Sequence, residues 1–167
     1  MIELEMFYEL RNLCVEIHLW NRKKNIFREI TAVFDTGANI THIDTGVLKR
    51  LGYDVSNADK SYVSTIGSRN MQINNTVIEN IKLGDVELGA AAVNFSDMSA
   101  ANSSVVLGMN ILKEFYITLD FEKELITMKP TFDINSKKAV EDFNKNDSRF
   151  GLWLINQTSA GEININK

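Results

Sequence analysis

The segment Ala32-Val33-Phe34-Asp35-Thr36-Gly37-Ala38 decides the fold of this chain. It begins with the end of an apolar, β-prone run, and the run stops at a carboxylate, which a hydroxyl and a glycine follow at once. A strand that ends on Asp-Thr-Gly can direct an acid out of a sheet toward a cleft, because the glycine lets the backbone pass close to that acid and to an extended ligand. Ala38 is small for the same reason. The segment therefore predicts that Asp35 stands at the end of a strand, in a functional position.

Peptide hydrolysis is one chemistry that such an acid can perform, and it needs two carboxylates that share one proton. One carboxylate draws a proton from water, and the other donates a proton to the carbonyl oxygen of the substrate. Two like charges in contact cannot both ionise, so the pair titrates as a unit. The chain has no second half with an equivalent segment, so the second carboxylate must come from another copy. A closed two-fold dimer would place Asp35 against its own symmetry mate.

A second Asp-Thr-Gly triplet begins at Asp44, only nine positions after Asp35. That spacing is too short for a second strand and turn to return a carboxylate beside the first. Asp44 lies where a helix N-cap belongs, apolar residues follow at helical spacing as far as Leu51, and Gly52 lies where a helix ends. We therefore expect the triplet at Asp44 to begin a helix and to take no part in catalysis.

The rest of the pattern predicts short strands separated by turns. Residues 14–20 alternate between apolar and polar side chains, as a half-buried strand does. A buried strand that ends on Gly108 is expected to run into a short helix. The other expected strands lie at 27–34, 61–66, 71–81, 88–95, 116–120 and 124–128.

Composition excludes several classes of function. The net charge is −4 with a pI near 5.2, and the only basic cluster is Arg22-Lys23-Lys24, so we expect no nucleic-acid partner. The two histidines and the single Cys14 offer no metal-ligand spacing, so neither a metal nor another cofactor is expected. Residues 1–5 lack a basic start and an unbroken apolar stretch, so we expect no secretory signal, no membrane association and a cytoplasmic location.

Two regions are expected along the chain. Residues 1–130 form the compact domain, which Pro130 closes, and residues 131–167 form a polar C-terminal extension. The extension carries an apolar run at 150–155. That run would be a liability if it were exposed, so we expect it to dock on the core or on a dimer partner.

These features together resemble the retropepsin-like aspartic proteases, the single-domain relatives of pepsin that act as homodimers and have cellular bacterial and eukaryotic members. The matching residues are Val33-Phe34-Asp35-Thr36-Gly37-Ala38 and, further along, Val106-Leu107-Gly108-Met109-Asn110-Ile111-Leu112. In that family the second motif is the strand that crosses behind the catalytic loop. The resemblance covers residues 14–129.

The resemblance implies a mainly β fold, a retropepsin-like acid protease half-barrel with one or two short helices, active as a C2 homodimer on a polypeptide substrate. By this resemblance Asp35 is the catalytic acid and base, and Thr36 forms a hydrogen bond between the subunits. Gly37, Ala38 and Gly108 support the active site. The flap that covers the substrate is assigned mostly by position, to Ile66, Gly67, Ser68 and Arg69.

Two positions depart from the retroviral members. Those proteins usually carry an acidic residue just after Asp-Thr-Gly-Ala and an arginine just after the later glycine, and the two pair near the dimer interface. Here the positions hold Asn39 and Met109. Both partners are changed together, so no unpaired charge remains, and the dimer contacts must be organised otherwise.

Two other functions fit parts of the sequence. The first is a catalytically silent dimeric module of the same fold that binds extended peptides or assembles complexes. The second is a phosphotransferase that uses Asp35 as its nucleophile after an apolar strand, as haloacid-dehalogenase-like enzymes do. Those enzymes need a second acid two residues later, and here that position holds Gly37.

Overall fold

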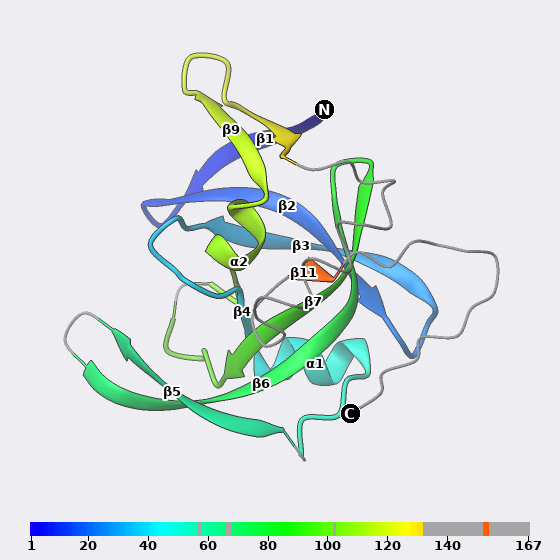
Figure 1. Ribbon diagram of the computed structural model, residues 1–167, viewed down its shortest axis with the longest axis vertical. Helices are drawn as coiled ribbons and strands as arrows, with labels where there is room; N and C mark the ends of the chain where they lie inside the picture. Colours follow the sequence, from blue (N-terminus) through cyan, green and yellow to red (C-terminus); the bar gives the residue numbers. More distant parts are fainter. Residues whose placement is uncertain (57, 66–67, 102, 132–151, 154–167) are drawn as a thin grey trace.

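The computed structural model describes residues 1–131 except 57, 66–67 and 102, together with residues 152–153. Within this part the chain is mainly β, with two short helices (Figure 1). The helices are α1 (Thr45–Leu51) and α2 (Met109–Leu112). The strands are β1 (Ile2–Glu9), β2 (Asn12–Asn21), β3 (Ile26–Phe34), β4 (His42–Asp44), β5 (Asp59–Thr65), β6 (Ser68–Leu83), β7 (Val86–Ser96), β8 (Val105–Leu107), β9 (Phe115–Asp120), β10 (Leu125–Pro130) and β11 (Leu152–Trp153).

The strands form one strongly curved sheet in the order β5-β6-β7-β4-β8-β3-β2-β1-β10-β9. An additional pairing between β6 and β2 closes the middle of this sheet on itself. The closed part encloses an apolar core, and β2 shows why: Val15, Ile17 and Leu19 are fully buried, while Glu16 and His18 between them are partly exposed. This alternation confirms the half-buried strand expected at 14–20.

Strands β3 and β4 lie on opposite sides of strand β8. Strand β3 pairs with β8 in parallel, with Val33 opposite Val106, and β4 pairs with the other side of β8 in the antiparallel sense. Between these two pairings the chain must cross the end of β8 in a loop, residues 35–41. The acid predicted at the end of a strand therefore lies on this crossing loop.

Helix α1 confirms the interpretation of the second Asp-Thr-Gly triplet. Asp44 is the N-cap, and its Oδ1 accepts hydrogen bonds from the backbone N–H groups of Gly46 and Val47. Gly52 ends the helix with a φ of 91°, a conformation that glycine adopts at little cost. The apolar side chains of the helix, Val47, Leu48 and Leu51, are buried in the core.

Strands β1 and β4 are among the elements that differ from the sequence-based expectation. Strand β1 was not expected, although Ile2, Leu4 and Met6 alternate with exposed glutamates and are buried. Strand β4 is short and begins at His42. Of the residues before it, Ala38 and Asn39 accept hydrogen bonds from the start of α2, and Thr41 O accepts from Asn94 N–H of β7.

Part of the predicted C-terminal extension pairs with the sheet. Leu152 and Trp153 form β11, which lies antiparallel to Ala91 and Ala90 of β7. The other residues after Thr131 lie outside the described part of the chain, so the division after residue 130 stays a prediction. Among the described residues, no helix combines the length and the apolar character that crossing a membrane requires.

Candidate active site

Asp35 follows directly on β3 and is held at both its backbone and its side chain. Its N–H donates to the carbonyl of Leu107 at 3.1 Å, so the pairing with β8 extends as far as the acid. Its Oδ1 accepts a hydrogen bond of 2.7 Å from the N–H of Gly37. Since one carboxylate oxygen is fixed by its own loop and the residue is partly exposed, the other oxygen is available to a partner or to water.

The two residues after Asp35 present little bulk around the carboxylate. A Cβ at Gly37 would lie 3.1 Å from Asp35 Oδ1, so a side chain there would crowd the acid. Thr36 is exposed, and its hydroxyl makes no hydrogen bond to the described part of the chain. The inter-subunit role that the resemblance gives to Thr36 is therefore open to it.

Gly108 lies where the crossing loop passes over the end of β8. A Cβ at this position would lie 2.6 Å from the backbone carbon of Ile40, 2.8 Å from Thr41 N and 2.9 Å from Ala38 O. All three are backbone atoms, which cannot swing away as a side chain can. The close approach of the loop to β8 therefore requires glycine here.

The sequence analysis missed a buried polar network that holds the same loop. Asn110 Oδ1 accepts hydrogen bonds from the backbone N–H of Thr41 at 2.7 Å and from its hydroxyl at 2.9 Å. The Thr41 hydroxyl oxygen in turn accepts from Gly108 N–H at 3.1 Å, and Asn110 Nδ2 donates to Ala92 O at 2.9 Å. Asn110 is almost fully buried within an apolar run, which is the signal that could have drawn attention to it.

Backbone hydrogen bonds occupy the place where retroviral members carry an ion pair. The N–H of Met109 donates to Ala38 O at 2.7 Å, and the N–H of Asn110 donates to Asn39 O at 3.0 Å. The start of α2 is thus joined to the crossing loop without any charged side chain. The contact between α2 and the crossing loop therefore needs no ion pair at positions 39 and 109.

The expected flap falls on the hairpin of β5 and β6, which projects from the rest of the sheet (Figure 1). Thr65 pairs with Ser68 at its end, and Arg69 follows in β6. Ile66 and Gly67 lie outside the described residues. Of the four assigned residues, Ser68 and Arg69 therefore lie at the start of β6, next to the end of β5, and the contact of all four with a substrate stays a prediction.

A surface cavity of about 610 Å³ lies elsewhere, at the start of α1. It is bordered by Asp44, Lys49, Asp97 and Met98, among other residues, and not by Asp35. Both carboxylate oxygens of Asp44 already accept hydrogen bonds. Oδ2 accepts from Met98 N–H, and Oδ1 accepts the two bonds that cap the helix. Among the described residues, no group of three or more His, Cys, Asp or Glu side chains could hold a metal ion.

Replacing Asp44 by alanine should lower the free energy of unfolding by about 1–2 kcal/mol, the usual effect of removing an N-cap. The change leaves the N–H groups of Gly46, Val47 and Met98 without their acceptor. Urea unfolding of the Asp44→Ala variant measures the loss. A stability equal to that of the wild type would contradict the assignment of Asp44 as a structural cap.

His42 should make the fold less stable in acid. Burial lowers the pKa of His42 below its usual value of 6.5, and the nearby Asp44 offsets this only in part. The unfolded chain then binds a proton at a higher pH than the folded chain, so this contribution to stability is present above about pH 6.5 and is lost as the pH falls below it.

The His42→Gln variant tests this dependence, because glutamine can still bond to Ser96 Oγ, which lies 2.8 Å from His42 Nε2, but it does not titrate. Thermal unfolding between about pH 7.5 and pH 5 should show a smaller acid-induced loss in the variant than in the wild type. Parallel curves for the two proteins would show that His42 is not the cause.

Solved structures of other proteins share this fold. A retropepsin-like aspartic protease from Rickettsia conorii has a similar fold, with a TM-score of 0.56 and 17% sequence identity over 75% of this chain and 89% of that chain. The retroviral protease-like domain of Ddi1 from Leishmania major matches with a TM-score of 0.47 and 17% identity, over 72% of this chain and 90% of that one. The fold is thus that of a retropepsin-like aspartic protease.

The sequence itself identifies the family. Residues 27–114, more than half of the chain, match the family described as "gag-polyprotein putative aspartyl protease", and the chain belongs to this family. The matched region contains Asp35, the expected flap and Gly108. No protein of curated function matches the sequence. Family membership and the mainly β retropepsin-like fold confirm the resemblance stated from the sequence.

Proposed function

We propose that this protein is an aspartic endopeptidase whose active site forms when two copies of Asp35 meet across a two-fold axis. The proposal rests on the position and the hydrogen bonds of Asp35 in a single chain. The carboxylate is fixed by Gly37 N–H and partly exposed, on a loop anchored to β8 and α2, in a member of an aspartyl protease family. One chain supplies one such acid, and the chemistry requires two.

In the proposed reaction the two Asp35 side chains share one proton. The ionised carboxylate takes a proton from a water molecule, which attacks the peptide carbonyl, and the protonated partner donates to the carbonyl oxygen. Collapse of the tetrahedral intermediate then transfers a proton to the leaving amine. The Gly37 N–H bond to Oδ1 holds each carboxyl in place, so the oxygens that face the axis perform the proton transfers.

The neighbouring residues have supporting roles in this proposal. Thr36, whose hydroxyl is exposed, bonds across the axis to the other subunit. Gly37 and Ala38 keep the floor of the cleft free of bulk, and Gly108 lets the loop lie close to β8. Residues 66–69 close over a polypeptide that binds in extended form, by main-chain pairing with the edges of the hairpin. No metal or other cofactor is required by this chemistry.

The proposal also covers the domain limits, the cellular location and the partners of the enzyme. We infer that residues 1–130 are the protease domain and that residues 131–167 are an extension of it. A cytoplasmic location is supported by the single cysteine, which cannot form a disulfide within the chain. The net charge of −4 and the lack of a basic stripe argue against a nucleic-acid partner.

A catalytically silent dimeric module of the same fold that binds extended peptides is the alternative. Incubation of the purified protein with fluorescein-labelled casein, an extended polypeptide, separates the two across a pH series. The proposal predicts fragments that accumulate with time in proportion to enzyme. Binding of casein without fragments at any pH would favour the silent module.

A further inference from the structure

We propose that helix α1 and the turn between β2 and β3 form a docking surface for an extended, acidic segment of another polypeptide. The surface is built around Lys23, Lys24, Lys49 and Arg50, which we call the α1 basic cluster. The inference goes beyond the proposed function and does not depend on it, because the cluster takes no part in the loop that carries Asp35 or in the contacts that hold that loop.

Hydrogen bonds and packing hold the β2–β3 turn against the end of α1. The N–H of Arg22 donates to Leu51 O at 2.9 Å, and Lys23 Nζ donates to Lys49 O, 26 positions along the chain, at 3.3 Å. A Cβ at Gly52 would lie 2.7 Å from Lys23 Cγ, so the turn packs directly on the residue that ends the helix. Figure 1 shows the end of the β2–β3 hairpin beside α1. Folding therefore joins the basic run of this turn to the basic last turn of the helix.

The four cations of the α1 basic cluster have no acidic partners in the part of the chain that the structure describes. Each is exposed, and none forms an ion pair with a described residue. Two acids nearby bind other groups: Glu79 Oε1 lies 2.8 Å from Arg22 Nε, and Asp54 Oδ1 accepts from Ser56 N–H at 2.9 Å. The whole chain has a net charge of −4, so the cluster is a local positive region on an acidic protein. A partner that carries carboxylates complements it.

The turn that carries two of the lysines is fixed by its own contacts. Asn21 is buried, and its Oδ1 accepts from Lys24 N–H at 3.0 Å while its carbonyl accepts from Asn25 N–H at 2.8 Å. Asn25 has a φ of 53°, which asparagine adopts more readily than most residues do. The guanidinium of Arg22 lies over the ring of Tyr53, 5.5 Å from its centre. Since the backbone of the turn is ordered before a partner arrives, less conformational entropy is lost on binding.

The cavity at the start of α1 adjoins the α1 basic cluster. Lys49 lines this cavity of about 610 Å³, and Arg50 Nη1 lies 3.3 Å from the place that a Cβ of Gly46, another lining residue, would take. Both side chains extend back along the helix, as helical side chains usually do. Asp97 also borders the cavity, and hydrogen bonds from Ser99 lower the pKa of its carboxyl group, so it is ionised at neutral pH. The cavity therefore suits a neutral polar residue of the segment, and the acidic residues lie over the cluster.

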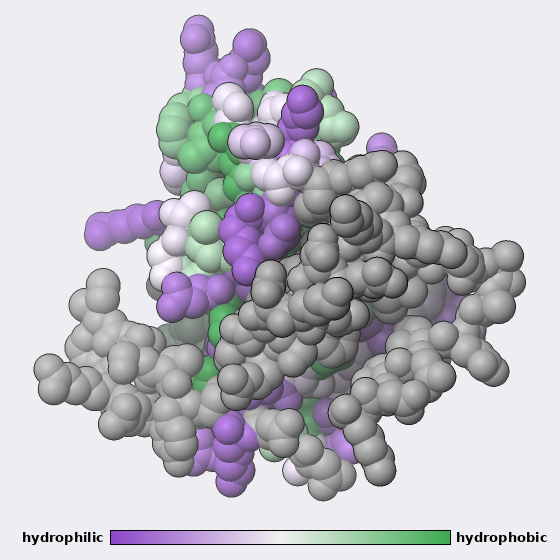
Figure 2. All heavy atoms as spheres, viewed as in Figure 1, coloured by the Kyte–Doolittle hydropathy of each residue, from purple (hydrophilic) through white to green (hydrophobic). Residues whose placement is uncertain are grey.

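The size and charge of the surface favour a short peptide over a nucleic acid. Helix α1 has 7 residues and is about 10 Å long, which matches about three or four residues of an extended chain. A nucleic acid would bring a continuous row of phosphates to a protein of net charge −4, with few cations to neutralise them. The coloured residues at the lower edge of Figure 2, the side on which Figure 1 places α1, are mostly hydrophilic. An acidic peptide needs only a few carboxylates to match this surface.

The test is the binding of a fluorescein-labelled peptide of alternating glutamate and serine, followed by fluorescence anisotropy at low ionic strength. The wild type should bind this peptide, should not bind the matching glutamine–serine peptide, and should lose affinity as added salt screens the charges. The double variant Lys23→Glu with Lys49→Glu replaces two attractive charges by repulsive ones. Its dissociation constant for the acidic peptide should rise by about 10-fold or more. Circular dichroism checks that the variant is folded.

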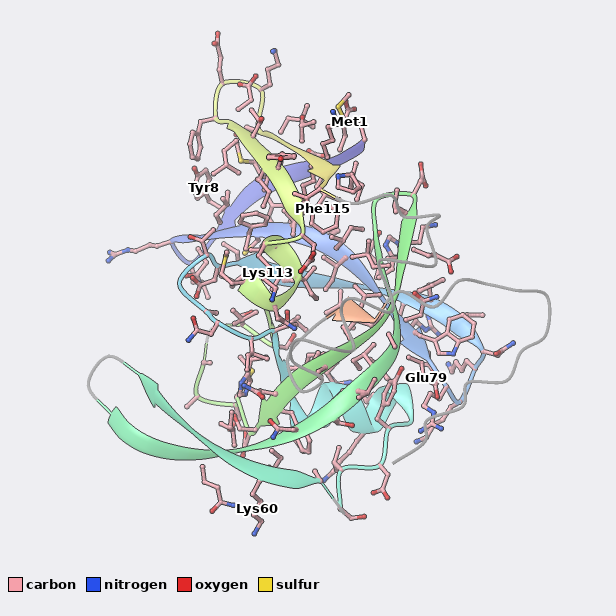
Figure 3. The ribbon with its side chains drawn as sticks, in the orientation of Figure 1. Met1, Tyr8, Lys60, Glu79, Lys113 and Phe115 are labelled. Atoms are coloured by element: carbon pink, nitrogen blue, oxygen red, sulfur yellow. The ribbon has the colours of Figure 1, made fainter. Side chains whose placement is uncertain are left out.

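The matched control is Arg11→Glu with Lys123→Glu, which changes the net charge by the same amount at another place. Arg11 directly precedes β2 and the β2–β3 turn follows it, so the 10 residues of this strand separate the two sites by about 30 Å. Figure 3 shows Tyr8, near Arg11 in the chain, and Glu79, the partner of Arg22, on opposite sides of the molecule. Lys123 pairs with Asp120 at the surface, a contact that contributes little to stability. The control should bind the acidic peptide as the wild type does.

A folded Lys23→Glu, Lys49→Glu variant that binds the acidic peptide as tightly as the wild type would overturn the inference, and so would a wild type that does not bind it at low ionic strength. Tighter binding of an oligothymidylate or of phosphatidylserine vesicles than of the peptide would also overturn it, because the partner would then be a nucleic acid or a membrane. Casein cleavage is measured separately. A protein that binds the peptide but does not cleave casein would refute the proposed activity and leave the docking surface standing. A protein that cleaves casein but does not bind the peptide would do the reverse.

Discussion

The Asp35→Asn variant is expected to cleave polypeptides at least about 10³-fold more slowly than the wild type, an effect within the range for loss of general acid–base catalysis. An asparagine pair cannot take a proton from water, and it cannot hold the single proton that the two carboxylates share. The amide has nearly the same shape as the carboxyl group, and its oxygen can still accept the hydrogen bond from Gly37 N–H. The fold should therefore survive while the activity is lost.

Release of fragments from fluorescein-labelled casein measures this loss, and thermal unfolding confirms that the variant is folded. The matched control is Asp44→Asn, the same chemical change at the other Asp-Thr-Gly triplet. The asparagine oxygen can still cap α1, as the Asp44 Oδ1 does, so this variant should retain wild-type activity. Cleavage by Asp35→Asn at the wild-type rate would remove Asp35 from the mechanism.

The Gly108→Ala variant is expected to lose about 3 kcal/mol of stability, at the upper end of the usual range for a single substitution. Its new Cβ would meet three backbone atoms of the crossing loop at 2.9 Å or less. The loop can relieve this contact only by moving away from β8, which weakens the bonds of Thr41 to Gly108 N and Asn110.

Gly37→Ala is the matched comparison for that prediction. A Cβ at Gly37 would meet only the side-chain oxygen of Asp35, at 3.1 Å, so its effect on stability should be much smaller. Urea unfolding of the two variants should therefore place Gly108→Ala well below Gly37→Ala, which crowds the carboxylate and should mainly reduce the activity. Equal stability of the two variants would show that the close packing at Gly108 is not essential to the fold.

Much of the fold could be predicted from local sequence patterns. The alternation at Val15, Ile17 and Leu19, the capping residue Asp44 and the helix-ending Gly52 each act over a few residues, and the structure has each feature in its predicted role. The family assignment rested on two longer motifs and is confirmed by the match over residues 27–114.

What the sequence did not reveal depends on contacts between distant segments. Asn110 and Thr41 are 69 positions apart, and nothing local to either residue indicates that their side chains meet behind the Asp35 loop. Strand β1 was missed for a different reason, because its alternating pattern is present but short and adjoins a turn of unusual residues, Leu10 and Arg11. The sequence thus indicated that Asp35 follows a strand, and it did not reveal the network that holds the loop after Asp35.

The central claim is that each active site takes one Asp35 from each of two subunits, and a subunit-mixing experiment tests it most directly. A fixed amount of wild-type protein is allowed to exchange subunits with increasing amounts of Asp35→Asn, and casein cleavage is followed. Random pairing with an inactive mixed dimer predicts about half of the starting activity at equal amounts and about a tenth at ninefold excess of the variant. Activity that stays constant as the variant is added, under conditions where exchange is complete, would mean that each chain carries a whole active site and would contradict the account.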